Sequence, residues 1–193
     1  MIELVKISKS YDGQVIFNEF SAKFVSGEPT LITGPSGRGK TTLLRLISGL
    51  ENADGGEIST NGAKFAVMFQ EPRLFPHANA IDNVRAVAKK ADYPIADAYF
   101  EKVGLSLDED SQKMPSELSG GMKQRVSLAR FLTFVHISRA DALLLDEPFS
   151  ALDGEFKEKI AALILEISRD KILVAVSHDT AEAQLFGARV IKL

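Results

Sequence analysis

A glycine-rich octapeptide, GPSGRGKT at residues 34–41, limits the possible folds of this chain more than any other segment. It fits the pattern G-x-x-x-x-G-K-[ST], follows the apolar run Leu31-Ile32-Thr33 and precedes a helical pattern over residues 41–50. Glycines let backbone N–H groups turn inward around phosphate oxygens, and a helix N-terminus adds unpaired N–H groups and a favourable dipole. The segment therefore predicts a strand–loop–helix unit that binds the phosphates of a nucleotide.

The chemistry of phosphate binding gives individual residues of this loop expected roles. Lys40 should reach the β- and γ-phosphates of ATP, and the Thr41 hydroxyl should ligate Mg²⁺. The residues expected to surround the nucleotide are Gly34, Pro35, Ser36, Gly37, Arg38, Gly39, Lys40, Thr41 and Thr42. For this motif taken alone, a glycine-rich turn with a surface lysine is the alternative interpretation.

The order of apolar patterns along the chain predicts an α/β fold. Residues 2–11 and 14–32 alternate with period two and are joined at Asp12-Gly13, which indicates an antiparallel hairpin. Further strands are expected at 64–70, 142–146 and 171–177, and helices at 41–50, 80–90, 95–103, 119–135 and 153–168. Because strands that alternate with helices favour a mainly parallel sheet, we expect a single domain over residues 1–193. It should combine a P-loop NTPase core, an N-terminal antiparallel β layer and an inserted helical subdomain at about 71–135.

The composition of the chain excludes several other classes of protein. The 193 residues contain no cysteine, so disulfides and cysteine-ligated metals are excluded. The net charge of -3 gives no general electrostatic reason to expect nucleic-acid binding. No stretch approaches the roughly 18 apolar residues that span a bilayer. Any role at a membrane should therefore come through partner proteins.

Two carboxylates follow another apolar strand. The sequence ALLLDEP at residues 142–148 places Asp146 and Glu147 at the carboxyl end of that strand, where open α/β sheets bind ligands. Successive strand residues point to opposite sides, so the two carboxylates cannot share one role. We expect Asp146 to hold Mg²⁺, through water, and Glu147 to polarise an attacking water as a general base. Without the phosphate loop, the same pair would indicate only solvated charges at the start of a loop.

These motifs, together with the segment LSGGMKQR at residues 118–125, resemble the ATP-binding subunits of ABC transporters. The family signature is LSGGQ, and here Met122 stands where glutamine is common. In the family this segment opens a helix and contacts the γ-phosphate of the ATP held by the opposite subunit, so the resemblance implies that role for Ser119, Gly120 and Gly121. It also implies a homodimer or a paired ABC ATPase subunit, with ATP and Mg²⁺ as cofactors.

Further residues match the family over essentially the whole chain. Gln70 matches the Q-loop glutamine, which contacts Mg²⁺ and water, and His178 matches the switch histidine near the γ-phosphate. Residues 150–153 match the D-loop, which crosses the dimer interface. Tyr11 matches the aromatic residue that stacks on adenine, although an aromatic in an N-terminal strand is often only packing. The residues to which the resemblance assigns a part in catalysis are Glu147, His178, Gln70 and Lys40.

The segments at 69–84 and 146–153 resemble importers of small solutes such as nitrate, sulfonate, taurine and thiamine. The resemblance implies a cytoplasmic subunit, peripheral on the inner face of the membrane, that drives an integral-membrane permease and acts indirectly with a solute-binding protein. Permease docking is expected through apolar side chains between Pro72 and Asn83, namely Leu74, Phe75 and Ile81. The alternative interpretation is that these three side chains only pack the helical subdomain.

Other functions stay open on the sequence alone. An exporter or lipoprotein-release ATPase would carry the same nucleotide motifs, and only the resemblance of residues 69–84 favours import. ABC ATPases that act on nucleic acid carry long insertions, for which this chain lacks the length. A non-hydrolysing binding module is disfavoured by the joint presence of the expected catalytic residues. One local departure is the stretch FLTFVHISRAD at 131–141, which is a few residues longer than the family pattern suggests.

Overall fold

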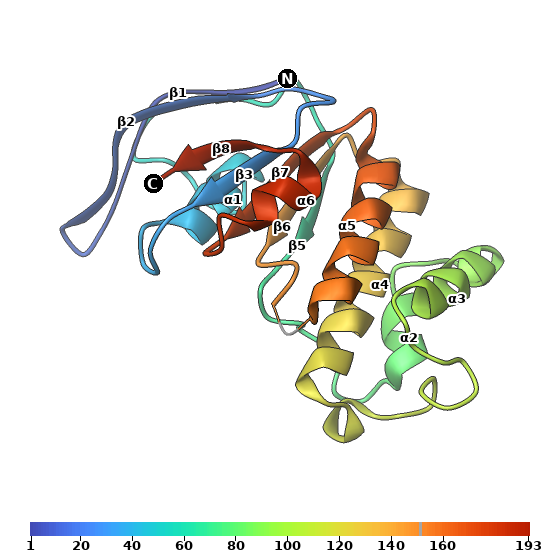
Figure 1. Ribbon diagram of the computed structural model, residues 1–193. Helices are drawn as coiled ribbons and strands as arrows, with labels where there is room; N and C mark the ends of the chain where they lie inside the picture. The colour runs from blue at the N-terminus through green and yellow to red at the C-terminus, as the bar shows by residue number, and fades with distance from the viewer. Residues whose placement is uncertain (151) are drawn as a thin grey trace. The chain divides into compact units, whose positions relative to one another are not determined.

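The computed structural model describes residues 1–150 and 152–193, and within them the chain forms two units (Figure 1). The first unit comprises Met1–Val67, Asp141–Glu147 and Ser168–Leu193, and holds nearly all of the β-structure. The second comprises Met68–Ala140 and Pro148–Ile167 and is helical. None of the helices among the described residues is both long and apolar enough to cross a membrane.

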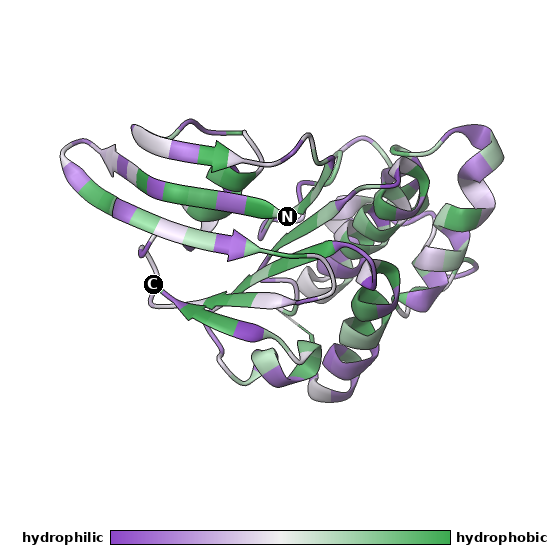
Figure 2. Ribbon diagram, turned by 90° about the horizontal axis from the view of Figure 1, so that it is seen from above, coloured by the Kyte–Doolittle hydropathy of each residue, from purple (hydrophilic) through white to green (hydrophobic). Residues whose placement is uncertain are grey.

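An antiparallel sheet forms the N-terminal layer of the first unit. Strands β1 (Ile2–Tyr11), β2 (Gln14–Phe24) and β4 (Gly55–Ser59) lie in the order β2-β1-β4. The hairpin predicted at Asp12-Gly13 is confirmed, since both residues have positive φ and Tyr11 pairs with Gln14 across the turn. Figure 2 shows hydrophilic and hydrophobic residues alternating along these strands, as expected for a sheet with one buried face.

A mainly parallel sheet forms the other layer of this unit. Its strands lie in the order β5 (Phe65–Met68), β6 (Ala142–Asp146), β7 (Ile172–Ser177), β3 (Thr30–Thr33) and β8 (Arg189–Lys192). Strands β6, β7 and β3 are buried at every residue, which explains their continuous apolar runs. The observed pairings β6–β7, β3–β7 and β3–β8 are parallel, so the predicted α/β class is confirmed.

Helix α1 (Lys40–Ile47) packs between the two sheets, and Figure 1 shows the antiparallel strands passing over it. Its buried residues Leu43 and Ile47 join one apolar cluster with Phe24 of β2 and Leu144 of β6. Burying an aliphatic side chain contributes about 1.5–3 kcal/mol, so this cluster fixes the start of α1 directly beyond β3. A short helix, α6 (Glu182–Phe186), also belongs to this unit.

The helices of the second unit pack around α4 (Gly120–Ser138), which contacts both α2 (Ala80–Arg85) and α3 (Tyr93–Lys102). A bidentate ion pair joins α2 to α3, with Arg85 Nη2 lying 2.7 Å from Asp97 Oδ2. The remaining helices are two short 3-10 turns, η1 (Lys90–Asp92) and η2 (Pro115–Glu117), and α5 (Gly154–Ser168).

Several predicted element boundaries were wrong. The strand expected over 14–32 is two strands, because the chain turns at Gly27, where φ is 77°. The helix expected over 80–90 ends at Arg85, and α3 begins at Tyr93 with Pro94 in its first turn, where proline is tolerated. Strands β4 and β8 and helix α6 were not predicted. The long stretch 131–141 continues α4 to Ser138, and Arg139 ends the helix in the left-handed conformation.

Candidate nucleotide-binding site

Three segments that are far apart in sequence meet at one edge of the parallel sheet. Strands β6, β7 and β3 are neighbours, with Asp146 paired to Val176 and Thr33 paired to Ser177. Their carboxyl ends therefore lie together, and each is followed directly by a predicted site residue: Gly34 after β3, Glu147 after β6 and His178 after β7. Ligands of open α/β sheets bind at such an edge.

The phosphate loop, residues 34–39, is tightly turned, and the side chain of the next residue, Lys40, bonds back to its first two residues. Its middle is bridged by a hydrogen bond that Arg38 N donates to Pro35 O at 3.3 Å. The buried Lys40 ammonium donates to the carbonyl oxygens of Gly34 at 2.7 Å and of Pro35 at 3.1 Å. The ammonium is thus held at the mouth of the loop by weak neutral acceptors, which a phosphate oxygen could replace.

Gly39 of the phosphate loop lies against strand β2 of the antiparallel sheet. It is the N-cap of α1 in the left-handed conformation, with φ 88°. A Cβ atom at this position would lie 2.3 Å from Ile16 Cγ2 and 3.0 Å from Phe17 Cζ, both on β2. Both the backbone conformation and the space therefore require glycine here, and β2 forms one wall of the loop.

A hydroxyl–carboxylate pair joins α1 to the end of β6. Thr41 Oγ1 donates to Asp146 Oδ2 at 2.6 Å, and Asp146 is only 3% exposed. Burial raises the pKa of the Asp146 carboxyl, while the Thr41 hydrogen bond and the charge of Lys40 act in the opposite direction. The predicted pair is thus in contact.

The donor set at this pair fits Mg²⁺ in one particular way. A hydroxyl and a carboxylate supply the hard oxygen ligands that Mg²⁺ prefers. In the described part of the chain no cluster of three or more His, Cys, Asp or Glu side chains could hold a metal by itself. The residues therefore suit an ion that takes its other ligands from water and substrate phosphates. Gln70, the third expected ligand, lies exposed at a bend just beyond β5 in the second unit, and its role stays a prediction.

Glu147 faces a different partner from Asp146. Its Oε2 atom lies 2.9 Å from Nδ1 of His178, and the Glu147 side chain is 12% exposed while that of His178 is 72% exposed. Glu147 also adopts the left-handed conformation, with φ 51°, and its N–H donates to Val176 O at 3.0 Å. A non-glycine residue held in this region costs about 1–3 kcal/mol, and such outliers cluster at functional sites. The two carboxylates thus have separate partners, and the separate roles expected of them stay predictions.

Tyr11 is the last residue of β1 and is held by Glu51 and Lys9, which no sequence motif indicates. Its hydroxyl donates to Oε1 of Glu51, and Lys9 Nζ lies 5.2 Å from the ring centroid. Burial raises the pKa of Tyr11, the bond to Glu51 adds to this effect, and an interaction with Thr42 opposes it. The residue is nevertheless 39% exposed.

The signature segment begins α4 in the second unit. Ser119 is the N-cap, and its Oγ accepts a hydrogen bond from Met122 N at 3.2 Å. Ser119 and Gly120 are exposed and Gly121 is half-buried, so the N-terminal N–H groups of a long helix are available to an anion. Of the predicted D-loop at 150–153, position 151 lies outside the described residues. Asp153 directly precedes α5, and its Oδ1 accepts from Phe156 N at 3.0 Å.

The predicted docking side chains divide into exposed and buried ones. Phe75 is 54% exposed, whereas Ile81 is 2% exposed, so the expectation that Ile81 contributes to a docking surface was wrong. Ile81 is buried because α2 packs on α3 and α4. The backbone of Phe75 is fixed by the buried Asn83, whose Oδ1 accepts from Phe75 N at 2.7 Å and whose Nδ2 donates to Phe75 O at 3.2 Å. Phe75 is therefore presented on a rigid loop.

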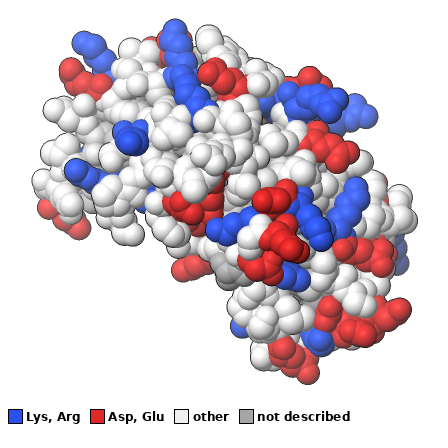
Figure 3. All heavy atoms as spheres, in the orientation of Figure 1, with Lys and Arg blue, Asp and Glu red and all other residues white. Residues whose placement is uncertain are grey.

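Charged side chains on the face drawn in Figure 3 are mixed in sign. Lysine and arginine side chains lie interspersed with aspartate and glutamate over this face. A positively charged stripe, which nucleic-acid binding would need, is not visible there.

Sequence comparisons relate the chain to transporter ATPases. The sequence profile of the ABC transporter family matches residues 17–150. The chain is 35% identical over 210 positions to the sulfate/thiosulfate import ATP-binding protein CysA of Yersinia pseudotuberculosis, an alignment that covers 98% of the chain and 57% of that relative. It is 35% identical over 204 positions to the aliphatic sulfonates import ATP-binding protein SsuB 2 of Burkholderia cenocepacia, covering 100% of the chain and 73% of the relative. The chain thus spans little more than half the length of the first of these relatives.

Comparison with solved structures gives the same result for the fold. The chain superposes on a dimeric ATP-binding cassette in a post-hydrolysis state, bound to ADP and Pi, with a TM-score of 0.86. Sequence identity to that structure is 28%, and the match covers 100% of this chain and 94% of the other. A second dimeric structure, of a bacterial ABC transporter cassette, gives a TM-score of 0.87 at the same identity.

Proposed function

The chain belongs to the ABC transporter family, and from this premise we propose that it binds and hydrolyses ATP to drive the import of a small solute through a partner permease. The observation that carries the proposal is the arrangement at the edge of the parallel sheet. There the phosphate loop, the Thr41–Asp146 pair and the Glu147–His178 pair follow neighbouring strands.

The phosphate loop provides the seat for the triphosphate. Backbone N–H groups of the loop, other than that of Arg38, and of the first turn of α1 would bind the phosphates. Lys40 would exchange the carbonyl oxygens of Gly34 and Pro35 for phosphate oxygens. Its ammonium would then donate to anionic oxygens in place of neutral carbonyl oxygens, which strengthens the bonds. Removing Lys40 should therefore weaken ATP binding itself.

Glu147 is the group that activates water in this proposal. Phosphoryl transfer to water needs positioning and charge neutralisation, and the attacking water also needs partial deprotonation. Glu147 is the carboxylate at this edge that Thr41 does not engage, and His178 holds it on its Oε2 atom. His178, whose side chain is largely exposed, is also free to approach the γ-phosphate.

Mg²⁺ would be held by Thr41 and Asp146, while the part expected of Gln70 stays a prediction. When bound, the ion neutralises charge on the β- and γ-phosphate oxygens. Asp146 is suited to this because a divalent cation offsets the cost of burying its charge. The Thr41 hydroxyl, which now donates to Asp146, would offer its lone pairs to the ion.

A second copy of the chain, or a related subunit, completes each ATP site. The N-terminus of α4, with Ser119, Gly120 and Gly121, belongs to the second unit of the chain and would contact the γ-phosphate of ATP seated on the other subunit's phosphate loop. The related cassettes are dimeric in their solved structures, which supports this pairing. One chain therefore carries two half-sites.

The import direction and the membrane partner rest on the relatives. Two of them are named import ATP-binding proteins, for sulfate/thiosulfate and for aliphatic sulfonates. Phe75, exposed on a rigid loop, is the anchor we propose for docking on the cytoplasmic side of the permease, which in turn would receive solute from a binding protein. The mixed charges in Figure 3 give no support to the nucleic-acid alternative.

Two substitutions separate binding from chemistry. Glu147→Gln keeps size and hydrogen bonding but removes basicity, and a positioned general base contributes about 10²–10⁴ in rate. We expect this variant to bind ATP within a few-fold of the native chain, to hydrolyse it about two orders of magnitude more slowly, and to persist as an ATP-bound dimer. Lys40→Ala should instead lose ATP affinity. Near-normal turnover by Glu147→Gln would show that another group acts as the base.

A further inference from the structure

A cluster of side chains between β1 and the loop after α1 fixes the position of Tyr11. Tyr11 donates to Oε1 of Glu51, and the Lys9 ammonium lies 3.2 Å from that same Oε1 atom. Lys9 also donates to Asp54 Oδ1 at 3.2 Å and to the carbonyl of Asn52 at 2.9 Å. We call these four groups, Lys9, Tyr11, Glu51 and Asp54, the Tyr11 cluster.

Backbone hydrogen bonds tie this cluster to the helix that begins with Lys40. Asp54 Oδ2 accepts from Ser10 N at 2.7 Å, and Asp54 N donates to Ser8 O at 2.9 Å, so the loop at 51–54 is stapled to β1. Glu51 N in turn donates to the carbonyl of Arg45 in α1 at 3.3 Å. The ring of Tyr11 is therefore positioned with reference to α1, and so to the phosphate loop.

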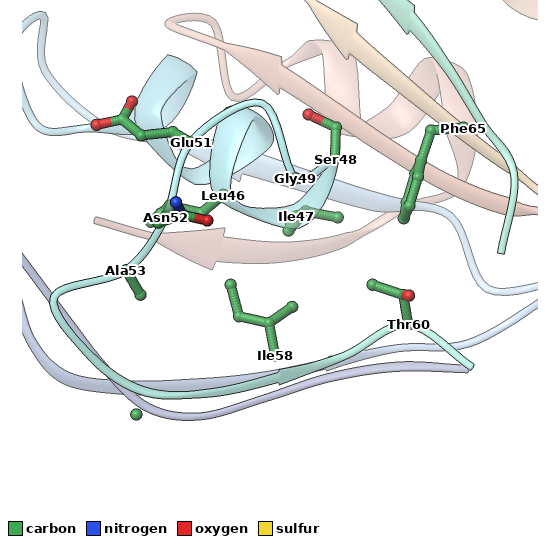
Figure 4. Close-up of a pocket in the computed structure, with 11 residues that line it drawn as sticks. Leu46, Ile47, Ser48, Gly49, Glu51, Asn52, Ala53, Ile58, Thr60 and Phe65 are labelled. Carbon is green, nitrogen blue, oxygen red and sulfur yellow. The ribbon is translucent and has the colours of Figure 1, made fainter. Parts of the chain in front are cut away.

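Glu51 is one of the residues that line a neighbouring pocket, but its carboxylate binds Tyr11 and Lys9. A pocket of about 380 Å³ lies between the end of α1 and β4 and is lined in part by Leu46, Ile58 and Phe65. Figure 4 shows the Glu51 carboxylate directed away from Ile58 and the interior of that pocket. The half-buried Glu51 carboxylate therefore binds Tyr11 and Lys9.

The protonation states of Tyr11 and Glu51 keep the direction of their hydrogen bond fixed. The hydrogen bond from Tyr11 lowers the pKa of the Glu51 carboxyl, with a smaller contribution from Lys9. Burial raises the pKa of the Tyr11 hydroxyl. At neutral pH the tyrosine is thus the donor and the carboxylate the acceptor, and the ring is tethered by its far end.

We propose that Glu51, with Lys9 behind it, is a positioning residue that holds the Tyr11 ring as a platform for the base of the bound nucleotide. The proposal rests on the proposed function and extends it to residues outside the phosphate-binding and catalytic groups. A ring that is 39% exposed but tethered at its hydroxyl loses little conformational freedom when a base stacks on it. Stacking of a base on an aromatic side chain is worth about 1–3 kcal/mol, so ordering the platform in advance preserves much of that gain.

The test compares ATP with inorganic tripolyphosphate, which has the phosphates but no base. In the full chain, Tyr11→Ala should weaken ATP binding about tenfold and leave tripolyphosphate binding unchanged. Glu51→Ala should reduce ATP affinity at least about threefold, again without an effect on tripolyphosphate. The double variant should be no weaker than Tyr11→Ala, because both substitutions remove the same platform.

Conservative and matched variants separate positioning from folding. Glu51→Gln keeps an acceptor and should restore most of the ATP affinity, while Tyr11→Phe removes only the tether and should resemble Glu51→Ala. Glu3→Gln is the control, because Glu3 also pairs with a lysine of the antiparallel sheet, Lys23 at 2.8 Å, and should change neither affinity. Equal losses for ATP and tripolyphosphate, additive losses in the double variant, or tighter ATP binding by Glu51→Ala would each overturn the proposal. Native chain that binds neither ligand would refute the proposed function itself.

Discussion

Replacing Asp146 with asparagine should stabilise the folded chain while it removes Mg²⁺-dependent hydrolysis. The carboxylate is 3% exposed, and its burial raises its pKa despite the hydrogen bond from Thr41 and the charge of Lys40. The ionised form is therefore disfavoured by folding. Asparagine can still accept from Thr41 through its Oδ1, because the two side chains have the same shape. The variant thus removes the desolvation cost and keeps the bond.

The free energy of unfolding should increase by about 0.5–2 kcal/mol, the range of common stabilising substitutions. The size of this increase depends on pH. A carboxyl whose pKa is higher in the folded chain than its ordinary value of 3.8 binds its proton more tightly when folded. Protonation therefore adds stability to the native chain as pH falls from the raised value toward 3.8. The advantage of Asp146→Asn should be largest at neutral pH and shrink on acidification.

Urea denaturation in EDTA, followed by circular dichroism at neutral pH and at about pH 4.5, measures this difference. Asp141→Asn is the matched control, since Asp141 is an exposed acid just before β6 whose Oδ2 accepts from Lys64 N at 2.9 Å. It should show no comparable gain. A less stable Asp146→Asn variant, or an advantage that grows on acidification, would refute the argument that burial dominates this site.

Two further predictions concern the loop and the docking residue. Gly39→Ala should lower the free energy of unfolding by about 1–3 kcal/mol and weaken ATP binding, because its Cβ would lie 2.3 Å from Ile16 Cγ2. Gly37→Ala is the control, with a similar φ of 81° but nothing within 4 Å, and should lower it less. Equal losses of stability in thermal unfolding would contradict the steric argument. Phe75→Asp should change the free energy of unfolding by no more than about 0.5 kcal/mol and leave basal ATP hydrolysis intact, because the residue is 54% exposed. It should also abolish transport when the permease is present, and a loss of folding would show that Phe75 is structural.

Much of the fold could be predicted from sequence because its strongest patterns are local. The Asp12-Gly13 turn and the apolar run before Asp146 depend on neighbouring residues alone, and both are confirmed. Strand β4 was missed because its sequence, GGEIS, has weak β-propensity and is a strand only through pairing with β1. Helix α2 was predicted too long because its end is set by packing against α3 and α4 and not by a local stop signal.

The candidate site divides in the same way. Lys40, Thr41, Asp146 and Glu147 could be proposed because they belong to motifs at the carboxyl ends of β3 and β6, and the strand order then brings these ends together. The contact of Glu51 with Tyr11 could not be predicted, because it joins β1 to a loop 40 residues away in sequence without any motif. A lysine two residues before the tyrosine, on the same strand face, was the one available signal.

Complementation between two inactive variants tests whether each ATP is hydrolysed between two chains. A Lys40→Ala chain lacks a working phosphate loop, and a Ser119→Arg chain blocks the N-terminus of α4. Each variant alone should be inactive, whereas their mixed dimer contains one site with both substitutions and one intact site. We predict that mixing restores hydrolysis well above the sum of the two parents. Mixed dimers that demonstrably form and yet show no hydrolysis beyond their parents would contradict the account.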